Sequence, residues 1–511
     1  MQLIWFKRDL RTVDHAALQG AISRAQARND PLLALYILEP ELWRQPDMSG
    51  RHYAFLTECL RDLYRSLKTQ GITLSVKTGP AVKILSGIHN KHSINALWSH
   101  QETWNGWTYK RDLEVKKWCQ AQSIDWREPQ QFGVVRRLSS RNLWAREWHK
   151  TMLAPPEATP SAPAPTPPPA ALSTSDRLPE PSELGLEPDP CPARLPGGRQ
   201  AGQNMMDSFL QERGQFYRKQ MSSPLTAFDA CSRLSPYLAF GAISVREAFQ
   251  ASLKRRQALD ALPVKDRPKG WIGSLKAFES RLRWHCHFIQ KLEDEPRLEF
   301  ENLHSAYDNL RNDPLDREKF KAWAQGRTGF PMIDACMRAL SQTGWLNFRM
   351  RAMLMSFASY HLWLHWREPA LHLARLFVDY EPGIHYSQCQ MQSGTTGINA
   401  MRIYNPEKQS REQDPDGVFL RKWVPEISGL PDHLIHTPWV NLGRTDKYPA
   451  PIIDEKRARK AAAQALYGLR RSSDHRTESG QIVSKHGSRR RPPQSRRRAS
   501  AKMSGQQELD I

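Results

Sequence analysis

Short apolar runs alternate with helical patterns over the first 135 residues of the chain. The runs cover residues 3–6, 32–38, 72–76 and 94–98. Apolar runs of this length, separated by amphipathic segments, are typical of the buried strands of a parallel sheet. Between the second and third runs, apolar residues recur at helical spacing from Phe55 to Leu67, which predicts a helix on one face of that sheet. We therefore predict an α/β domain with a parallel sheet at residues 1–135.

The pattern changes after the predicted sheet. Residues 154–198 hold fourteen of the 37 prolines among Ala, Ser, Thr and Glu, which predicts an extended linker because this composition buries little apolar surface. Residues 200–465 show helical periodicity and no convincing series of strands, so we predict a large all-α domain. Residues 468–511 are rich in Arg, Ser, Gly and Pro, which predicts a disordered basic tail.

The composition restricts the classes of partner and ligand. A formal net charge of +21 over 511 residues favours an anionic polymer such as nucleic acid. Seventeen Trp, seventeen Phe and thirteen Tyr supply a core that suits a flat aromatic ligand. The seven cysteines form no CxxC pair, which argues against a zinc site and against a disulfide framework.

Further features favour a cytoplasmic protein. No apolar run approaches the roughly 20 residues that span a membrane, and the first residues lack the order of a signal peptide. No Gly-rich phosphate loop follows the first apolar run, so a dinucleotide site at that position has little support. We expect a monomer without membrane contact.

Two segments of the predicted helical domain carry a candidate polar site. One runs from Thr343 to Arg351, and the other, residues 377–386, contains Asp379. A guanidinium offers fixed donors and a carboxylate accepts, so Arg351 and Asp379 together suit a polar ring. The spacing alone favours an ordinary ion pair that pins two helices.

Six short motifs occur in a fixed order along the chain. They are WFKRDLR at 5–11, SRLSPYL at 232–238, TGFPMIDA at 328–335, TGW at 343–345, RIYNP at 402–406, and DPDG to RKWVPE at 414–426. In order and spacing these motifs resemble DNA photolyases and cryptochromes, over residues 1–150 and 205–440. The resemblance implies an antenna domain of α/β type and a helical domain that holds a folded FAD beside a DNA-binding face. It also implies a possible second chromophore of folate or deazaflavin type, whose identity stays open.

The resemblance assigns residues to the flavin site. Those expected around the FAD phosphates are Tyr217, Cys231, Ser232, Arg233, Leu234 and Ser235, and those expected around the remaining groups are Phe278, Arg351, Asp379, Tyr380, Glu381 and His385. Cys231 stands where Thr is usual, and a thiol is a weaker donor than a hydroxyl. Backbone amides at the following helix start can compensate for that loss.

The family's reaction is electron transfer from excited, reduced flavin to a pyrimidine dimer flipped out of DNA. Trp284 matches one of two aromatic residues that clamp the dimer, whereas Met391 replaces the other. Arg281 stands where a dimer-bonding Glu is usual, and His385 where the family places the residue that faces flavin N5. A histidine there can exchange a proton and tune the redox state of the flavin.

The family's chain of tryptophans that reduces the flavin is incomplete. Trp366 matches its middle member, but Cys389 occupies the flavin-proximal position and no Trp lies around Leu310. Photoreduction therefore needs another path, for which Trp345, Trp363 and Tyr386 are available.

Three functions remain open. The favoured one is light-dependent repair of cyclobutane pyrimidine dimers in DNA, and the alternative is a cryptochrome-like blue-light photoreceptor that signals through the flavin redox state. The third and weaker one is a DNA-bound flavoprotein that has lost catalysis. The final residues also resemble a peptide that binds the replication sliding clamp, with Gln506 in a polar pocket and Leu509 and Ile511 in an apolar one. This clamp interaction is a separate hypothesis.

Overall fold

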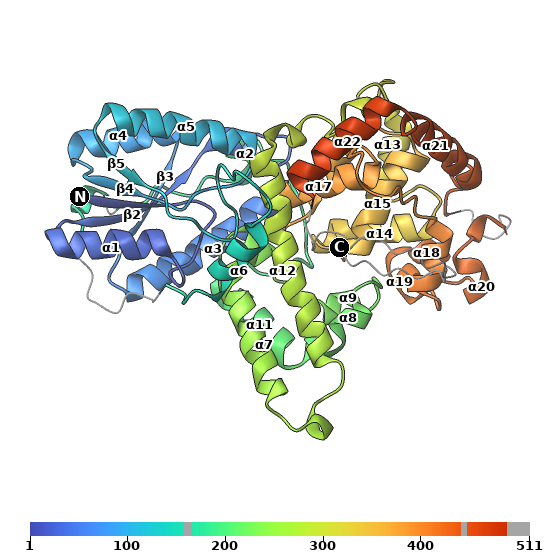
Figure 1. The fold of residues 1–511 in the computed structure, drawn as a ribbon, viewed down its shortest axis with the longest axis horizontal. Coiled ribbons are helices and arrows are strands. Elements are labelled where there is room, and N and C mark those ends of the chain that lie inside the picture. The colour runs from blue at the N-terminus through green and yellow to red at the C-terminus, as the bar shows by residue number, and fades with distance from the viewer. Residues whose placement is uncertain (158–165, 173, 441–446, 488–511) are drawn as a thin grey trace.

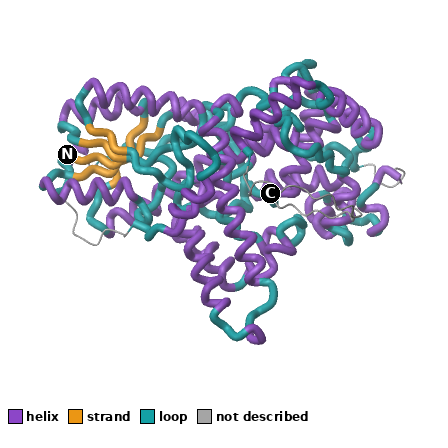
Figure 2. Tube along the Cα trace, in the orientation of Figure 1, coloured by secondary structure: helices purple, strands orange, loops and turns teal. Residues whose placement is uncertain are grey.

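The computed structural model describes residues 1–157, 166–172, 174–440 and 447–487. They form a parallel-sheet domain at the N-terminus and a larger helical region (Figure 1). The strands lie within the first domain, and the remainder of the described chain is helix and loop (Figure 2). The predicted fold class is confirmed.

The sheet has five parallel strands in the order β3-β2-β1-β4-β5. The strands are β1 (Gln2–Phe6), β2 (Leu32–Leu38), β3 (Leu74–Thr78), β4 (Ala96–Trp98) and β5 (Asp125–Arg127). The first four correspond to the predicted apolar runs. The sequence pattern did not indicate β5, because this edge strand is exposed at both ends and carries charged residues.

Helices cover both faces of the sheet. These are α1 (Ala16–Arg28), α2 (Pro40–Trp43), α3 (Gly50–Thr69), α4 (Ala81–Lys91), α5 (Gly106–Ala121) and α6 (Trp144–Leu153). Ile4 and Phe6 of β1 belong to the same core as α1 and α3, whereas Leu3 and Trp5 pack with α4 and α5. Because successive side chains of a strand point to opposite faces, a strand buried on both faces reads as an unbroken apolar run.

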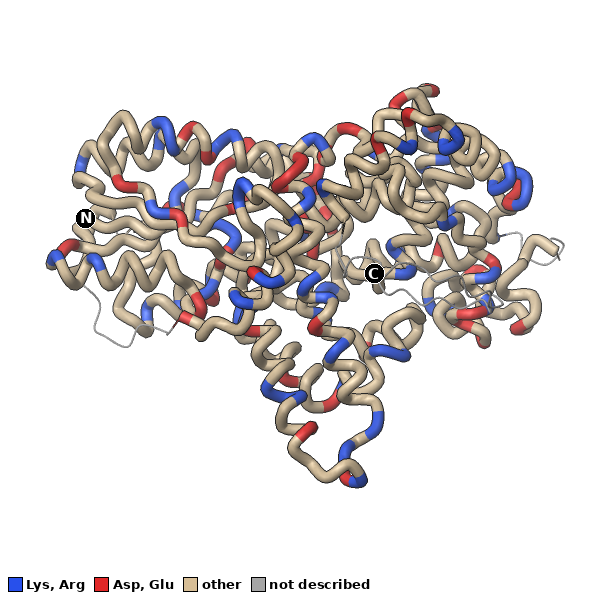
Figure 3. The backbone as a smooth tube through the Cα atoms, viewed as in Figure 1, with Lys and Arg blue, Asp and Glu red and all other residues tan. Residues whose placement is uncertain are grey.

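The helical region is built around the long helix α12, which contacts α17 and α11. Its helices are α7 (Arg199–Gln211), α8 (Tyr217–Gln220), α9 (Ala227–Ala230), α10 (Ser235–Ala239), α11 (Val245–Asp260), α12 (Trp271–Asp294), α13 (Arg317–Ala324), α14 (Pro331–Thr343), α15 (Phe348–Ser356), α16 (Arg367–Leu376), α17 (Pro382–Ser393), α18 (Pro406–Gln413), α19 (Val418–Trp423), α20 (Asp432–Ile435), α21 (Glu455–Leu469) and α22 (Ser473–His486). α11 and the first part of α12 project together away from the rest of the molecule (Figure 1). Lys and Arg are spread over both domains and along this projection (Figure 3).

The two domains share one hydrophobic core and a polar junction. Arg11 donates from Nη1 to the carbonyl oxygen of Gly241 at 3.0 Å, and Ser244 donates to Oδ2 of Asp14 at 2.5 Å. Gly241 has φ +66°, and a Cβ at this position would collide with the backbone of Arg8. Glycine is therefore required where the helical region meets the loop after β1.

The Pro-rich segment is not extended throughout. Its described part follows the edge strand β3: Ser75 donates to the carbonyl oxygen of Thr174 at 3.0 Å, and Val76 N donates to Oγ of Ser175 at 3.1 Å. Leu184 is buried in the common core. The physical reason for the difference is the unpaired backbone of the edge strand, which offers hydrogen bonds to the segment. Residues 158–165 and 173 lie outside the described residues.

Part of the predicted disordered tail is helical, because α22 forms within residues 468–511. Ser472 caps this helix by accepting from His475 N, and α22 buries His475, Ile482 and His486. A helix with so few apolar positions has no clear periodic signal in the sequence. Residues 488–511, and with them the predicted clamp-binding peptide, lie outside the described residues. No described helix combines the length and apolarity needed to cross a membrane.

Candidate functional site

The residues assigned to the flavin and to the lesion come from several helices of one region. Tyr217 begins α8, and Cys231 to Ser235 connect α9 to the start of α10. Phe278, Arg281 and Trp284 lie on α12, Arg351 lies on α15, Asp379 to Glu381 precede α17, and His385 and Met391 lie on it. α17 packs against both α12 and α15.

Arg351 and Asp379 form a two-bond ion pair. Nη1 donates to Oδ1 at 3.0 Å and Nη2 to Oδ2 at 2.7 Å, while Nε donates to the carbonyl oxygen of Leu346 at 2.7 Å. The side chain of Asp379 is 3% exposed and that of Arg351 is 29% exposed. The guanidinium also lies 3.9 Å from the ring centroid of Phe377. The pair is therefore fixed in orientation, with one edge open to a ligand.

Positive charge surrounds Cys231. Burial raises the pKa of its thiol to about 12, against the opposing charges of Arg233, Arg213, Arg351 and Arg281. The guanidinium of Arg233 lies 4.2 Å from the ring centroid of Trp345, and its buried Nε has no hydrogen-bond partner among the described residues. A buried donor without a partner is rare and expensive. This donor set fits an anionic ligand such as a pyrophosphate.

An aromatic wall lies beside this basic cluster. Phe209 contacts Phe278 at a centroid distance of 4.9 Å and Tyr217 at 5.6 Å. Burial raises the pKa of Tyr217, while the nearby Arg281 acts in the opposite direction. Arg281 in turn stacks over the ring of Phe348 at 5.0 Å.

Glu381 lies at the start of α17, where the helix comes close to α12. A Cβ on Gly383 would lie 2.6 Å from Cα of Ile289, so glycine permits this close approach. Burial raises the pKa of Glu381 to about 8, and Arg8 opposes the shift. Its Oε1 is buried without a partner in the described structure. At neutral pH the carboxyl is mostly protonated, so it can both donate to and accept from a ligand.

His385 is held by the protein backbone. Its Nε2 lies 2.8 Å from the carbonyl oxygen of Ala370, which can only accept, so Nε2 carries a proton. The ring packs against Tyr380 and Tyr386 at centroid distances of 5.3 and 5.4 Å. Burial lowers the pKa of His385 to about 4. His385 is therefore neutral at physiological pH, with Nδ1 as the remaining ring nitrogen.

Trp284 and Met391 are half-buried, and neither belongs to the hydrophobic clusters of the described residues. The ring of Trp284 contacts His287 at 4.8 Å and Phe288 at 5.6 Å, both on its own helix. Trp284 is therefore not a core aromatic residue.

Trp366 is fully buried and donates from Nε1 to Oδ1 of Asn302 at 2.9 Å. Tyr386 is its neighbour at a centroid distance of 6.2 Å. Of the other candidates for an electron path, Trp345 stacks with Arg233 and Trp363 with Arg311.

Two features of this region had no signal in the sequence. The first is Asp47, whose Oδ2 accepts a hydrogen bond from Tyr380 Oη at 2.6 Å. The second is a cavity of about 860 Å³ between the start of α5, the end of α12 and α22, with Trp104, Tyr109 and Glu299 among its lining residues. A crevice at the carboxyl ends of β1 and β2, where open α/β sheets usually bind ligands, is reduced to about 30 Å³ by side chains including Trp43.

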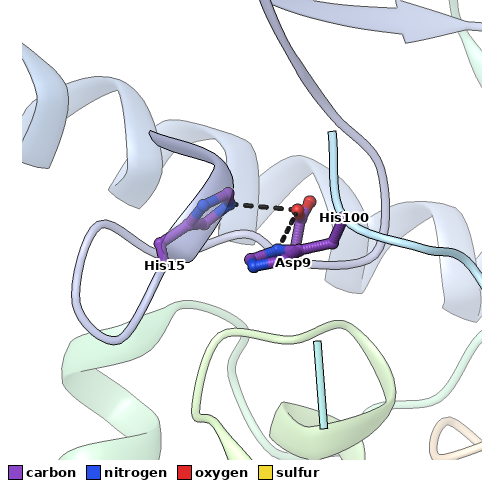
Figure 4. A group of neighbouring side chains, drawn as sticks. All are labelled: Asp9, His15 and His100. Atoms are coloured by element: carbon purple, nitrogen blue, oxygen red, sulfur yellow. Dashed lines mark hydrogen bonds and ion pairs between the residues drawn. The ribbon is translucent and has the colours of Figure 1, made fainter. Parts of the chain in front are cut away.

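A buried cluster of Asp9, His15 and His100 lies at the loop after β1 (Figure 4). Oδ2 of Asp9 lies 3.0 Å from Nε2 of His15 and 2.8 Å from Nδ1 of His100. Nδ1 of His15 accepts from Leu18 N at 3.0 Å, so Nε2 carries the proton that faces Asp9. Burial alone would raise the pKa of Asp9, but the two histidines hold it well below its usual value. The contact of His100 with Asp9 is a hydrogen bond, whereas Nε2 of His15 meets Asp9 at ion-pair distance without a hydrogen bond in the described structure.

Two family models match the chain. Residues 2–140 match the DNA photolyase model, and residues 278–468 match the FAD binding domain of DNA photolyase. The second match contains Phe278, Arg351, Asp379 and Glu381, and the first ends just before α6.

Curated relatives and solved structures extend the similarity to almost the whole chain. A cryptochrome DASH from Gloeobacter violaceus is 26% identical over 94% of this chain and 98% of its own. A deoxyribodipyrimidine photo-lyase from Escherichia coli is 28% identical over 92% and 99%.

Among solved structures, a bacterial class III photolyase from Agrobacterium tumefaciens has a TM-score of 0.75 at 24% identity, covering 92% of this chain and 98% of its own. An archaeal photolyase from Sulfolobus tokodaii, solved with two FAD molecules, has a TM-score of 0.72 at 25% identity, covering 92% and 100%. The fold, the two family models and these relatives together show that the chain belongs to the DNA photolyase/cryptochrome family.

Proposed function

We propose that the protein is a photolyase that uses FAD and blue light to split cyclobutane pyrimidine dimers in DNA. The observation that carries the proposal is Trp284, a half-buried tryptophan whose ring contacts lie on its own helix. Such a ring offers a face to a flipped base, and stacking on an aromatic side chain stabilises a bound base by about 1–3 kcal/mol. Relatives named deoxyribodipyrimidine photo-lyase support the same substrate.

The donor set supports FAD as the cofactor. Arg233 Nε and Glu381 Oε1 are buried without partners among the described residues, and the Arg351–Asp379 pair is rigid. In this proposal Arg233 and the turn from Cys231 to Ser235 hold the phosphates, and Asp379 and Glu381 orient the ring system. Bound FAD would supply the electron that opens the dimer and would recover it afterwards. The protein's own contribution is positioning and exclusion of water.

The cavity of about 860 Å³ is the proposed place of a second chromophore. Its volume falls in the range of ligand pockets for cofactor-sized molecules, and Trp104 and Tyr109 supply aromatic faces. The crevice at the sheet edge has only about 30 Å³ and is too small for a chromophore. The solved relative with two FAD molecules shows that a photolyase fold can hold two chromophores. Extraction and chromatography of the purified protein, with Trp104→Ala as the comparison, tests this placement.

Repair of a defined lesion tests the main proposal. The reduced, FAD-loaded protein is incubated with an oligonucleotide that carries one cyclobutane thymine dimer, in duplex and in single-stranded form, with and without blue light. Restoration of the intact thymines is followed by chromatography. We expect repair that requires light, and we expect Trp284→Ala to weaken lesion binding about tenfold or more because the stacking face is lost.

Trp107→Ala is the matched control, because Trp107 is also a half-buried tryptophan but lies on α5 of the other domain. We expect it to bind and repair the lesion as the unaltered protein does. A protein that holds FAD and leaves the dimer intact in the light is not a photolyase for this lesion.

The packing of α22 favours a second candidate, a blue-light photoreceptor. His475 stacks on His304 at 4.2 Å, and Lys485 pairs with Glu295 at 2.5 Å, so a helix beyond the matched FAD domain docks on it through side-chain contacts. Light-dependent hydrogen exchange in residues 473–486, without dimer repair, would support this function. Equal exchange in light and darkness would count against it.

A further inference from the structure

Three buried side chains with ionisable oxygens meet where the two domains join. Tyr380 Oη donates to Oδ2 of Asp47 at 2.6 Å and lies 3.1 Å from Oη of Tyr386. Asp47 follows α2 in the α/β domain, whereas the two tyrosines lie at the start of α17. Each residue is exposed by 3% or less. Water has little access, so these phenols depend on acceptors within the protein.

Aromatic rings continue from this cluster in two directions. The centroid distances are 6.2 Å from Trp366 to Tyr386, 6.2 Å from Tyr386 to Tyr380, and 5.8 Å from Tyr380 to Trp104. All three lie within the contact range of aromatic pairs. Trp104 lines the cavity of about 860 Å³. Four contiguous rings therefore connect the buried Trp366 with an opening in the protein.

Asp47 gives Tyr380 an acceptor for its proton, which ordinary packing of aromatic rings in a core does not provide. An oxidised phenol is strongly acidic, so a buried tyrosine can lose an electron readily only when an acceptor for its proton lies at hydrogen-bond distance. Oδ2 of Asp47 is at that distance, and Oδ1 is buried without a partner in the described structure. Burial, reinforced by Asp47, holds the pKa of Tyr380 well above its usual value. Tyr380 therefore keeps its proton until it is oxidised.

We propose that Tyr380 donates an electron to the photoexcited, oxidised flavin, with Asp47 as the acceptor of its proton and Trp104 as the next electron donor. The inference rests on the proposed function, because it requires bound FAD. It supplies a path at the point where Cys389 replaces the flavin-proximal tryptophan of the family. Tyr386, in contact with both Tyr380 and Trp366, extends the same path inward.

Each step balances in electrons and protons. Tyr380 passes one electron to the flavin, its O–H bond breaks, and an O–H bond forms on Asp47, which leaves a neutral tyrosyl radical. Trp104 then gives one electron to that radical while the proton returns from Asp47. A thiol from solution reaches Trp104 through the cavity and restores it by giving one electron. One thiol electron is thus consumed for each electron that leaves Tyr380.

The test uses the full chain with oxidised FAD bound, illuminated with blue light in the presence of dithiothreitol. Electron paramagnetic resonance detects the tyrosyl radical, and infrared difference spectroscopy detects the newly protonated carboxyl. We expect both signals in the unaltered protein. Asp47→Asn removes the acceptor of the proton, and Tyr380→Phe removes the hydroxyl that gives it up. Each variant should therefore lose both signals and slow flavin reduction about ten- to hundredfold.

Tyr53→Phe is the matched control. Tyr53 is buried, and its hydroxyl donates to the carbonyl oxygen of Pro179 at 2.7 Å. A carbonyl does not take up the proton of an oxidised phenol, so this variant is expected to reduce flavin at the unaltered rate.

The outcomes separate the two proposals. Flavin reduction at the unaltered rate in both Asp47→Asn and Tyr380→Phe, with FAD fully bound, overturns the path and leaves the proposed function standing. Slower reduction without any tyrosyl signal in the unaltered protein also overturns it, because the effect is then structural. A chain that binds no FAD overturns both proposals.

Discussion

Replacing Arg351 with glutamine removes one half of the ion pair between α15 and the segment before α17. The change deletes both charge-assisted bonds to Asp379 and the bond to the carbonyl oxygen of Leu346. The carboxylate of Asp379 then has no cationic partner, and water cannot replace that partner because the side chain is only 3% exposed. Glutamine retains one amide that can donate to the carboxylate.

The expected loss follows from these exposures. Breaking a fully buried ion pair costs about 3–5 kcal/mol. The Arg351 side chain is 29% exposed, so water screens part of the interaction. We therefore expect the free energy of unfolding of the helical region to fall by about 2–3 kcal/mol. Arg351→Lys keeps the charge but not the fork of donors, and its loss should be smaller.

Urea denaturation followed by tryptophan fluorescence measures this effect, and FAD content is read from absorbance in parallel. Arg349→Gln is the control: Arg349 is on the same helix, and its hydrogen bond goes to Gln409 at 3.4 Å rather than to a carboxylate. Unchanged midpoints for Arg351→Gln would refute the reasoning, as would an equal loss in Arg349→Gln. Normal stability with lower FAD content would mean that the Arg351–Asp379 pair contributes to FAD binding and not to the stability of the fold.

Three further predictions follow from burial and backbone geometry. Gly241→Ala is expected to lower the free energy of unfolding by about 2–5 kcal/mol, because φ is +66° and the Cβ collides with the backbone of Arg8. Ala242→Gly nearby should have a much smaller effect in the same urea titration. The pKa of Glu381 is about 8 in the folded state against 4.5 ordinarily, so the folded state binds the proton more tightly and stability should fall as pH rises from about 5 to 8. Glu381→Gln should flatten that fall, and an unchanged pH profile would contradict the assignment. Ile482→Ser removes a buried contact of α22 with Leu292 and Leu298. We therefore expect faster protease cleavage within residues 473–486, with an unchanged urea midpoint for the remaining chain. A protease pattern equal to that of the unaltered protein would count against this docking.

Elements with a continuous apolar run or with periodic burial could be predicted from the sequence, and those without either could not. The strand β1 buries both faces and so appears as an apolar run, whereas β5 is a short exposed edge strand with no such run. α22 was hidden because its buried positions are His475, Ile482 and His486 in a polar composition. The Pro-rich segment was placed by tertiary hydrogen bonds to β3, which no local composition encodes.

Some residues of the candidate site could likewise be predicted from the sequence, and others could not. Arg351 and Asp379 lie in two motifs, and their chemistry suggested a pair before the structure placed them together. Asp47 stands more than three hundred residues before Tyr380 along the chain, in a loop without any motif. The large cavity is likewise built from segments near residues 104, 140, 295 and 484. Long-range neighbours of this kind are set by the packing of whole domains and leave no local pattern.

The hydrophobic core that runs through both domains restricts the motions that the two domains can make relative to each other. Ile4 and Phe6 of the sheet and Phe240 of the helical region belong to one cluster, and Arg11 and Gly241 fasten the same boundary. Rigid-body rotation of one domain against the other would have to break that cluster, at the expense of much of the stability of the fold. Photochemical changes at the flavin should therefore propagate through small peripheral elements rather than through a hinge. In the photoreceptor alternative, signal output belongs to the periphery, and the two domains act as one stiff frame around the proposed flavin site.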